Sequence, residues 1–155
     1  MAFELVVVSN TPLTPVSDLD EVGVALLRQV GYLGRGADDE ANARESVAYR
    51  LFRDCFVMRP DKAWTAEELI AALGTSRPTL YRHLNKLKAL DLLEESALRD
   101  EGEAGGRKAY RIRYGNLAKA WNFVEANVKV AMENYRKTVD HLHALAERSM
   151  KEGRS

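Results

Sequence analysis

Apolar residues recur at helical spacing in two stretches near the start of this chain. The first stretch covers residues 17–30, where Ser17 and the acidic side chains after it suit the positive end of a helix. The second covers residues 38–58 and ends before Pro60, because proline restricts the residue that precedes it. The pattern therefore predicts two amphipathic helices, joined by a glycine-rich connection over residues 31–36.

A short β-branched run precedes the first helix. The run Phe3–Val8 stops at a Thr-Pro pair that occurs twice, and it predicts one strand. We assign residues 1–36, with this strand and the following helix, to an N-terminal extension of unassigned role.

Residues 65–89 show a helix, a tight turn and a second helix. Thr65 and Glu68 stand three residues apart, as in a capping box, and Gly74 ends the helix that they begin. A minimal strand over residues 63–64 is expected just before this helix.

The second helix of the pair separates an apolar face from a basic one. Thr75 or Ser76 caps this helix, and its apolar positions at i, i+4 and i+7 predict the buried face: Leu80, Leu84 and Leu87. The opposite face and its flanks carry cations and no acid. Candidate DNA contacts on this reader helix are Ser76, Arg77, Thr79, Tyr81, Arg82, Asn85 and Lys86.

These residue types match the groups that duplex DNA presents. Arg82 can reach guanine O6 and N7, and Asn85 can pair with adenine. Ser76, Thr79 and Lys86 suit phosphate oxygens. A solvated basic helix face is the simpler interpretation of such a helix in isolation, but the turn before it and the hairpin after it favour contact with DNA.

A hairpin follows the reader helix. Residues 92–93 open its first strand, and residues 110–114 alternate bulky side chains with arginine, as a half-buried strand does. The connecting loop, residues 96–108, contains three glycines and acidic residues that would repel phosphate. Arg107 and Lys108 at the base of this wing are further candidate contacts, to the DNA backbone or minor groove.

A helix-turn-helix followed by a wing is the winged-helix arrangement. The phrase LGTSRPTLYRHLNKLKALDLLEE and the later GRKAYRI resemble winged-helix regulators of the MarR/ArsR superfamily, and also the GbsR-like group, in which a long helix follows the wing. The resemblance implies a dimeric bacterial or archaeal transcription factor. It maps the reader positions of the family onto Ser76, Arg77, Thr79, Tyr81, Arg82 and Asn85. We expect a mainly α-helical fold with a small β-wing, its DNA-binding domain covering residues 37–114.

A long amphipathic helix is predicted over residues 115–150, with a tail over residues 151–155. A helix about 50 Å long, at 1.5 Å per residue, is more than one small domain can cover, so pairing with a second copy is the simplest arrangement. A homodimer would also place two reader helices about one DNA turn apart. Packing inside the monomer, against residues 17–30, is the alternative. Spacings of four and three, which pass through Thr138, define the candidate seam residues: Leu117, Trp121, Val124, Val128, Ala131, Tyr135, Leu142 and Leu145.

Charge and cysteine content narrow the class of protein. The net charge is zero, yet residues 1–40 hold 2 basic and 7 acidic side chains, whereas residues 76–115 hold 9 basic and 6 acidic ones. This distribution indicates that the chain binds DNA through one local basic surface rather than through a high total charge. The single cysteine, Cys55, lies in an apolar run and predicts a buried, inert thiol in a reducing compartment. The apolar run near the start is too short for a signal peptide or a membrane span, so we expect a cytoplasmic protein.

Three other functions would require different residues. Asp140, His143 and Glu147 share one helix face and are weak candidates for a metal site of the kind that ArsR-like sensors build. No enzyme signature is present, and no cofactor is expected. A winged helix that serves protein–protein assembly is the remaining alternative, with the acidic residues 1–40 as its docking surface. In a DNA-binding regulator, a pocket between the terminal helix and the core could hold a small-molecule effector, but no motif names one.

Overall fold

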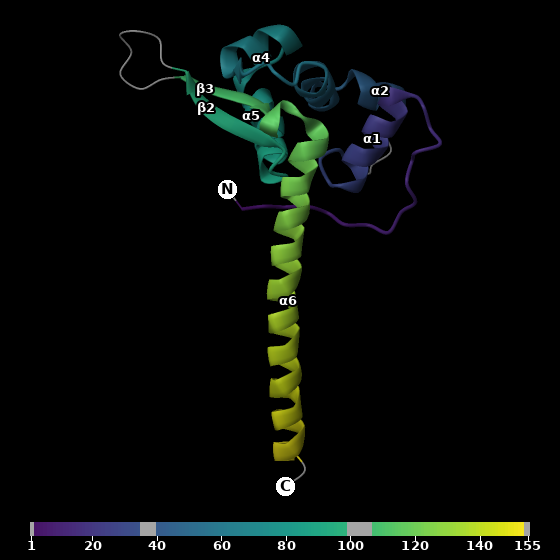
Figure 1. Cartoon of the computed structure of the whole chain (residues 1–155), viewed down its shortest axis with the longest axis vertical. Helices are drawn as coiled ribbons and strands as arrows, with labels where there is room; N and C mark the ends of the chain where they lie inside the picture. Colours follow the sequence, from purple (N-terminus) through teal and green to yellow (C-terminus); the bar gives the residue numbers. More distant parts are fainter. Residues whose placement is uncertain (1, 35–39, 99–106, 154–155) are drawn as a thin grey trace.

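Helices make up most of the fold, and a small sheet lies beside the reader helix (Figure 1). The computed structural model describes residues 2–34, 40–98 and 107–153. In chain order the elements are α1 Leu19–Gln29, α2 Glu40–Glu45, α3 Val47–Arg50, the π-helix η1 Leu51–Val57, β1 Trp64–Thr65, α4 Ala66–Leu73, α5 Arg77–Ala89, β2 Leu93–Leu98, β3 Arg107–Ile112, the 3₁₀ turn η2 Arg113–Gly115 and α6 Leu117–Gly153. The predicted class, mainly α with a β-wing, is confirmed.

The sheet has three antiparallel strands in the order β1-β3-β2. β2 and β3 form the wing hairpin, with Leu93 opposite Ile112 at its base. β1 pairs Trp64 with Tyr110, so the minimal strand exists but lies one residue later than expected. One hydrophobic core joins the helices to this sheet, and it includes side chains of α1, η1, α5 and α6.

The N-terminal segment is extended but is not a strand, so the prediction for Phe3–Val8 was wrong. The Glu4 N–H donates to the Ala89 carbonyl (2.9 Å) and the Val6 N–H donates to the Val30 carbonyl (3.2 Å). Both acceptors lie at the ends of helices rather than along a strand edge. A ladder therefore cannot form, although the segment is tied down at two points.

The first helix begins later than predicted. Asp18, not Ser17, is its N-cap, because the Asp18 carboxylate accepts the N–H groups of Asp20 (2.9 Å) and Glu21 (3.0 Å). Gly23 fits here because a Cβ at this position would lie 2.7 Å from the Tyr49 hydroxyl. The glycine thus lets α1 pack closely on Tyr49 of α3.

The single helix predicted over residues 38–58 is divided, and residues 38–39 lie outside the described part. Ser46 adopts an extended conformation between α2 and α3, where its hydroxyl accepts the Tyr49 N–H (3.2 Å) and donates to the Ala43 carbonyl (2.7 Å). A serine mid-helix can replace backbone bonds with its own. The chain then continues as the π-helix η1, whose buried side chains include Phe52 and Cys55.

Two boundaries around the last helix also differ from the predictions. β3 ends at Ile112, and Tyr114 lies exposed in η2 with a φ of 62°, so it is not a strand residue. α6 continues to Gly153, so residues 151–153 are helical rather than a tail. The glycines and acids of the wing loop at 99–106 lie outside the described residues. Among the described helices, none combines the length and apolar character needed to cross a membrane.

Candidate nucleic-acid interface

α4 and α5 form the helix-turn-helix, and both begin at the predicted caps. The Thr65 hydroxyl accepts the Glu68 N–H (3.2 Å), and the Glu68 carboxylate accepts the Thr65 N–H (3.1 Å), which completes the capping box. α4 ends at Gly74. At α5 the Ser76 hydroxyl accepts the Thr79 N–H, which settles the choice between Thr75 and Ser76. These bonds fix where the reader helix starts.

α5 presents two distinct faces. Leu80, Leu84 and Leu87 are fully buried and anchor the helix in the core. Thr79 and Tyr81 are half-buried. The remaining candidate contacts on this helix and its cap are exposed: Ser76, Arg77, Arg82, Asn85 and Lys86.

Arg77 is engaged within the chain. Its guanidinium donates to the Glu67 carboxylate of α4 (3.0 Å), and both side chains are more than half exposed. The same hydrogen bond holds the pKa of Glu67 below its ordinary value. Arg77 therefore links the two helices, and DNA would have to compete with Glu67 for it.

Lys88, the last cation of α5, is also engaged. Its ammonium forms an ion pair with Glu95 of β2 and lies 5.6 Å from the centroid of the Tyr110 ring. By contrast, Asn85 and Lys86 make no side-chain hydrogen bond or ion pair with any residue that the structure describes. Among the described residues, the side chain of Arg82 approaches a hydrogen-bonding partner at His83 alone (3.5 Å), so the available basic surface centres on Arg82 and Lys86.

Tyr81 has a structural partner on the wing. It packs against the core, and its hydroxyl lies beside Tyr110. Burial raises the pKa of Tyr110 to about 12, and the neighbouring Tyr81 and Glu95 add to the effect. Tyr81 therefore joins α5 to β3, a role that spacing along the helix could not reveal.

His83 lies on the reader helix and is half-buried. Its Nδ1 is buried without a hydrogen-bond partner among the described residues, while its Nε2 lies 3.5 Å from Arg82 Nη2. Burial, with Arg82 and Lys86 nearby, lowers the pKa of this imidazole below 6.5. The ring is thus held neutral beside the exposed Arg82.

The base of the wing carries the two predicted cations. Arg107 and Lys108 are exposed in β3, opposite Leu98 and Ala97 of β2. Arg111 in β3 and Arg113 in η2, the arginines that alternate with bulky side chains over residues 110–114, have internal partners. Arg111 donates to Glu94 (2.9 Å). Arg113 donates to the carbonyls of Asp91 (3.1 Å) and Leu93 (3.2 Å) and stacks on the Phe123 ring of α6 at 4.0 Å.

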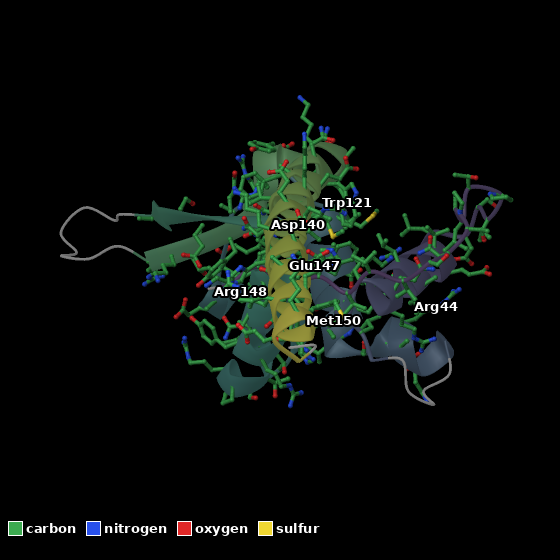
Figure 2. The ribbon with its side chains drawn as sticks, turned by 90° about the horizontal axis from the view of Figure 1, so that it is seen from below. Arg44, Trp121, Asp140, Glu147, Arg148 and Met150 are labelled. Atoms are coloured by element: carbon green, nitrogen blue, oxygen red, sulfur yellow. The ribbon has the colours of Figure 1, made fainter. Side chains whose placement is uncertain are left out.

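α6 is buried near its start and exposed along the rest of its length (Figures 1 and 2). Asn116 caps it by accepting the Lys119 N–H (3.1 Å). Of the candidate seam residues, Val124 is fully buried within its own chain, and Leu117, Trp121, Val128 and Ala131 are half-buried. Val124 thus belongs to the monomer core. The distal candidates stay open to solvent, with exposures of 66% for Tyr135, 65% for Leu142 and 41% for Leu145.

The weak metal candidates on α6 do not gather into a site. Asp140 forms an ion pair with Arg136 (3.4 Å), and His143 pairs with Glu147 (2.9 Å) one turn along the helix. No group of three or more metal-ligating side chains occurs in the described part of the chain. Cys55 is buried, and burial raises the pKa of its thiol to about 11.

Fold and site together define a winged helix-turn-helix domain whose second helix, α5, carries an exposed basic face. A family model described as a helix-turn-helix domain matches residues 45–96, which run from the end of α2 to the start of the wing. The chain is similar to a solved structure described as a possible transcriptional regulator from Methanosarcina mazei Go1. That structure is 18% identical, the match covers 62% of this chain and 77% of the other, and the TM-score is 0.43. No curated protein matches the chain.

Proposed function

We propose that this chain is a sequence-specific double-stranded DNA-binding transcriptional regulator that acts as a homodimer, with α5 in the major groove. The observation that carries the proposal is the exposed face of α5. There Arg82, Asn85 and Lys86 project from a helix whose opposite leucines are fully buried. The helix-turn-helix that holds this face is the element that inserts a reader helix into DNA in many regulators.

The roles of the side chains follow from their chemistry. A guanidinium reads guanine through O6 and N7, and a carboxamide reads adenine through N6 and N7, so Arg82 and Asn85 supply specificity. Lys86, the Ser76 cap and the wing-base pair Arg107 and Lys108 supply phosphate contacts, which position the protein without reading sequence. A domain organisation with the reader unit over residues 37–114 suits these assignments.

The homodimer rests on the distal half of α6. Met132, Tyr135, Val139 and Leu142 lie on one face of the helix and are each more than half exposed, over a length of helix that the rest of the chain does not cover. Large exposed apolar stripes mark interaction sites. Two copies joined along this stripe would bury it and bring a second reader unit to the complex, as palindromic operators require. Thus the distal seam residues, rather than Val124, would carry dimerisation.

The test is DNA binding by the full chain, measured by fluorescence anisotropy over a salt series. The duplexes are sequences selected from a random library by the wild-type protein, beside a scrambled duplex. Arg82→Ala should weaken binding to the selected duplex by about 1–3 kcal/mol and relax base preference, because it removes a base contact. Lys86→Ala should weaken all duplexes alike and reduce the salt slope by about 1.

Lys137→Ala is the matched control, since it removes one positive charge from the exposed part of α6. It should leave both affinity and preference close to wild type. If Arg82→Ala weakens binding to the selected and the scrambled duplex equally, Arg82 does not read bases. Absence of preferential binding by the wild type, even at low salt, would reject the proposed function.

A further inference from the structure

A basic notch of about 200 Å³ lies between the reader helix and the first helix of the chain. Arg28, in the last turn of α1, and Lys86 of α5 both line it. Asn42 of α2, Ser46 at the start of α3 and His83 of α5 add uncharged polar groups. No carboxylate lines the basic notch among the described residues. The charge that its lining side chains bring together is therefore positive.

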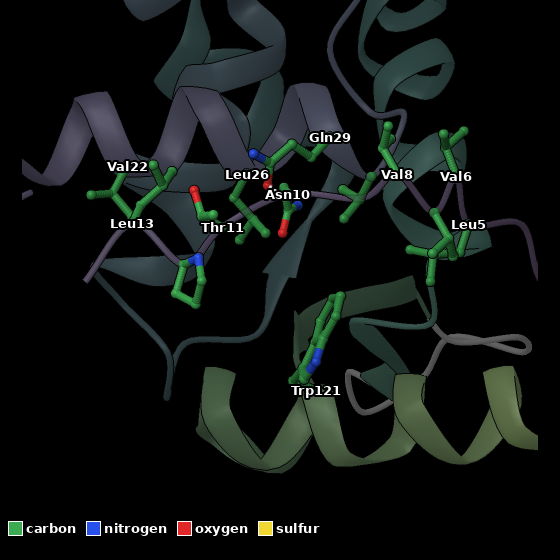
Figure 3. Close-up of a pocket in the computed structure, with 13 residues that line it drawn as sticks. Leu5, Val6, Val8, Asn10, Thr11, Leu13, Val22, Leu26, Gln29 and Trp121 are labelled. Atoms are coloured by element: carbon green, nitrogen blue, oxygen red, sulfur yellow. Dashed lines mark hydrogen bonds between the residues drawn. The ribbon is translucent and has the colours of Figure 1, made fainter. Parts of the chain in front are cut away.

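Two other hollows beside α1 differ from the basic notch in their charge. The larger one, shown in Figure 3, lies between the N-terminal segment, α1 and Trp121 of α6, and no charged side chain lines it among the described residues. The other is lined by three arginines and three acids, and Arg44 (3.9 Å) and Arg53 (2.7 Å) each form an ion pair with Asp20 there. Of these three hollows, the basic notch is the one whose charge suits an anion.

His83 supplies an N–H group that lacks an acceptor. A guanidinium can only donate, so Nε2 of His83 is the acceptor in its contact of 3.5 Å with Arg82 Nη2. The imidazole proton then lies on Nδ1, which is buried and has no hydrogen-bond partner among the described residues. Buried donors nearly always have an acceptor, and an anionic oxygen in the basic notch would provide one.

The basic notch lies toward α1, away from the wing. Figures 1 and 2, which view the molecule at right angles, show α1 and the wing hairpin on opposite sides. The N-terminal segment ties α1 to the end of α5, because the Glu4 N–H donates to the Ala89 carbonyl and the Val6 N–H donates to the Val30 carbonyl. A major groove that receives α5 is flanked by two sugar–phosphate strands. With the base of the wing beside one strand, the basic notch would lie beside the other.

We propose that the basic notch binds a phosphate group of the DNA backbone, which makes α1 a second DNA-contacting element on the side of α5 away from the wing. The guanidinium of Arg28 can donate two parallel hydrogen bonds to phosphate oxygens, and Lys86 adds a point charge. The affinity for a phosphate group stands on the notch alone, whereas DNA as the source of that phosphate rests on the proposed function.

Single methylphosphonate substitutions in the selected duplex test the contact, because each one removes the charge of one phosphate. At least one substitution should weaken binding of the wild-type chain about fivefold. The same substitution should change binding of Arg28→Gln less than about twofold, because the side chain and the phosphate act as a pair. Arg107→Gln, at the base of the wing, should lose its sensitivity at a different phosphate.

The salt dependence gives a second measure of the contact. Arg28→Gln should weaken the selected and the scrambled duplex by the same factor and reduce the salt slope by about 1. Arg28→Lys should keep the slope and recover part of the affinity, since an ammonium carries the charge without the paired bonds. Arg148→Gln makes the matched change on the exposed part of α6 and should behave as the wild type.

Urea unfolding checks that each variant is folded, and Arg28→Lys takes the place of Arg28→Gln in the methylphosphonate series if the latter does not fold. An unchanged salt slope in folded Arg28→Gln would overturn the proposal. Sensitivity of both Arg28 variants to the same phosphates as the wild type, and to the same extent, would also overturn it.

Inorganic phosphate tests the basic notch without DNA. Titrated into the full chain at constant ionic strength against chloride, it should shift the imidazole NMR signals of His83 saturably and leave those of His141 and His143 on α6 unmoved. Absence of a saturable shift, or the same shift in Arg28→Gln, would overturn the notch as a phosphate site. Phosphate binding by a chain that binds no DNA would refute the proposed function and keep the notch. Phosphate binding with DNA affinity that is insensitive to Arg28 would overturn the DNA contact and assign the notch to a free phosphate.

Discussion

Arg77 shows how one neighbouring side chain decides what a cation of the reader helix can do. Its exposure and position suit phosphate binding, yet Glu67 accepts its hydrogen bond at 3.0 Å. An exposed ion pair of this kind is worth little in water, at most about 1 kcal/mol. DNA could therefore displace Glu67, at the cost of bringing a carboxylate near phosphate.

Glu67→Gln should strengthen DNA binding for all sequences. The change removes a negative charge from the DNA-facing side and frees Arg77 for a phosphate, so the salt slope should increase by about 1. Anisotropy over a salt series measures both quantities. Glu147→Gln, on distal α6, makes the same change away from the reader helix and should have no effect. Weaker binding in Glu67→Gln would instead mean that the ion pair positions α5.

His83 should make stability depend on pH. Burial and the nearby cations lower the pKa of its imidazole in the folded state, so the unfolded chain takes up a proton first as pH falls. The contribution of neutral His83 to the free energy of unfolding is present at pH values above 6.5, the ordinary pKa of histidine. This contribution is lost as the pH falls below 6.5. Urea unfolding at pH 7.5 and 5.5 should show this loss, and His83→Gln should show a smaller one. An equal loss in both proteins would assign the effect to other groups.

At the scale of the element, the reader helix depends on its cap. The Ser76 hydroxyl accepts the Thr79 N–H, a group that has no partner inside the helix. Ser76→Ala should therefore lower the free energy of unfolding by about 1 kcal/mol, measured by urea titration. Ser149→Ala, in the interior of α6, removes a hydroxyl where alanine is a better helix former, and it should not destabilise the protein. Equal behaviour of the two variants would show that the cap contributes nothing.

The sequence predicted those elements whose ends are set by local bonds. The box of Thr65 and Glu68 and the Ser76 cap are interactions between residues three apart, so the pattern alone was enough to place α4 and α5. The helix over residues 38–58 followed the same period but was divided at Ser46. There the Ser46 hydroxyl replaces helical bonds with its own, and just beyond it the Tyr32 hydroxyl donates to the Ala48 carbonyl from outside the helix. A periodicity cannot report bonds made from outside the segment.

At the scale of the whole molecule, the exposed half of α6 should hold two copies together. Leu142→Glu places a charge in the apolar stripe, so it should convert the dimer to a monomer in sedimentation equilibrium. Leu142 is 65% exposed in the single chain, so the variant should keep its fold. Lys137→Glu, which adds an acid at an exposed position outside the stripe, should remain dimeric. A dimeric Leu142→Glu protein would contradict the proposed seam.

The candidate site was predicted less completely than the fold. Spacing identified which face of α5 is exposed, because that follows from Leu80, Leu84 and Leu87. It could not identify the partners of Arg77 and Lys88, which lie on α4 and β2. The apolar pocket between the N-terminal segment, α1 and Trp121 of α6 could not be predicted either, since it depends on residues 2–13 lying against α1 and α6. Such contacts depend on tertiary packing rather than on periodicity.

The junction between the wing and α6 has a mechanical consequence. Arg113 stacks on Phe123, and Asn127 donates to Asp91 at 2.7 Å, so the base of α6 is attached to the turn that ends the reader helix. With 37 residues at 1.5 Å each, α6 is a lever about 55 Å long. A tilt of about 5° at its base would move the far end by roughly 5 Å. If two copies are joined at the distal ends of their α6 helices, a displacement of a few ångströms at those ends would therefore rotate each reader helix by only a few degrees.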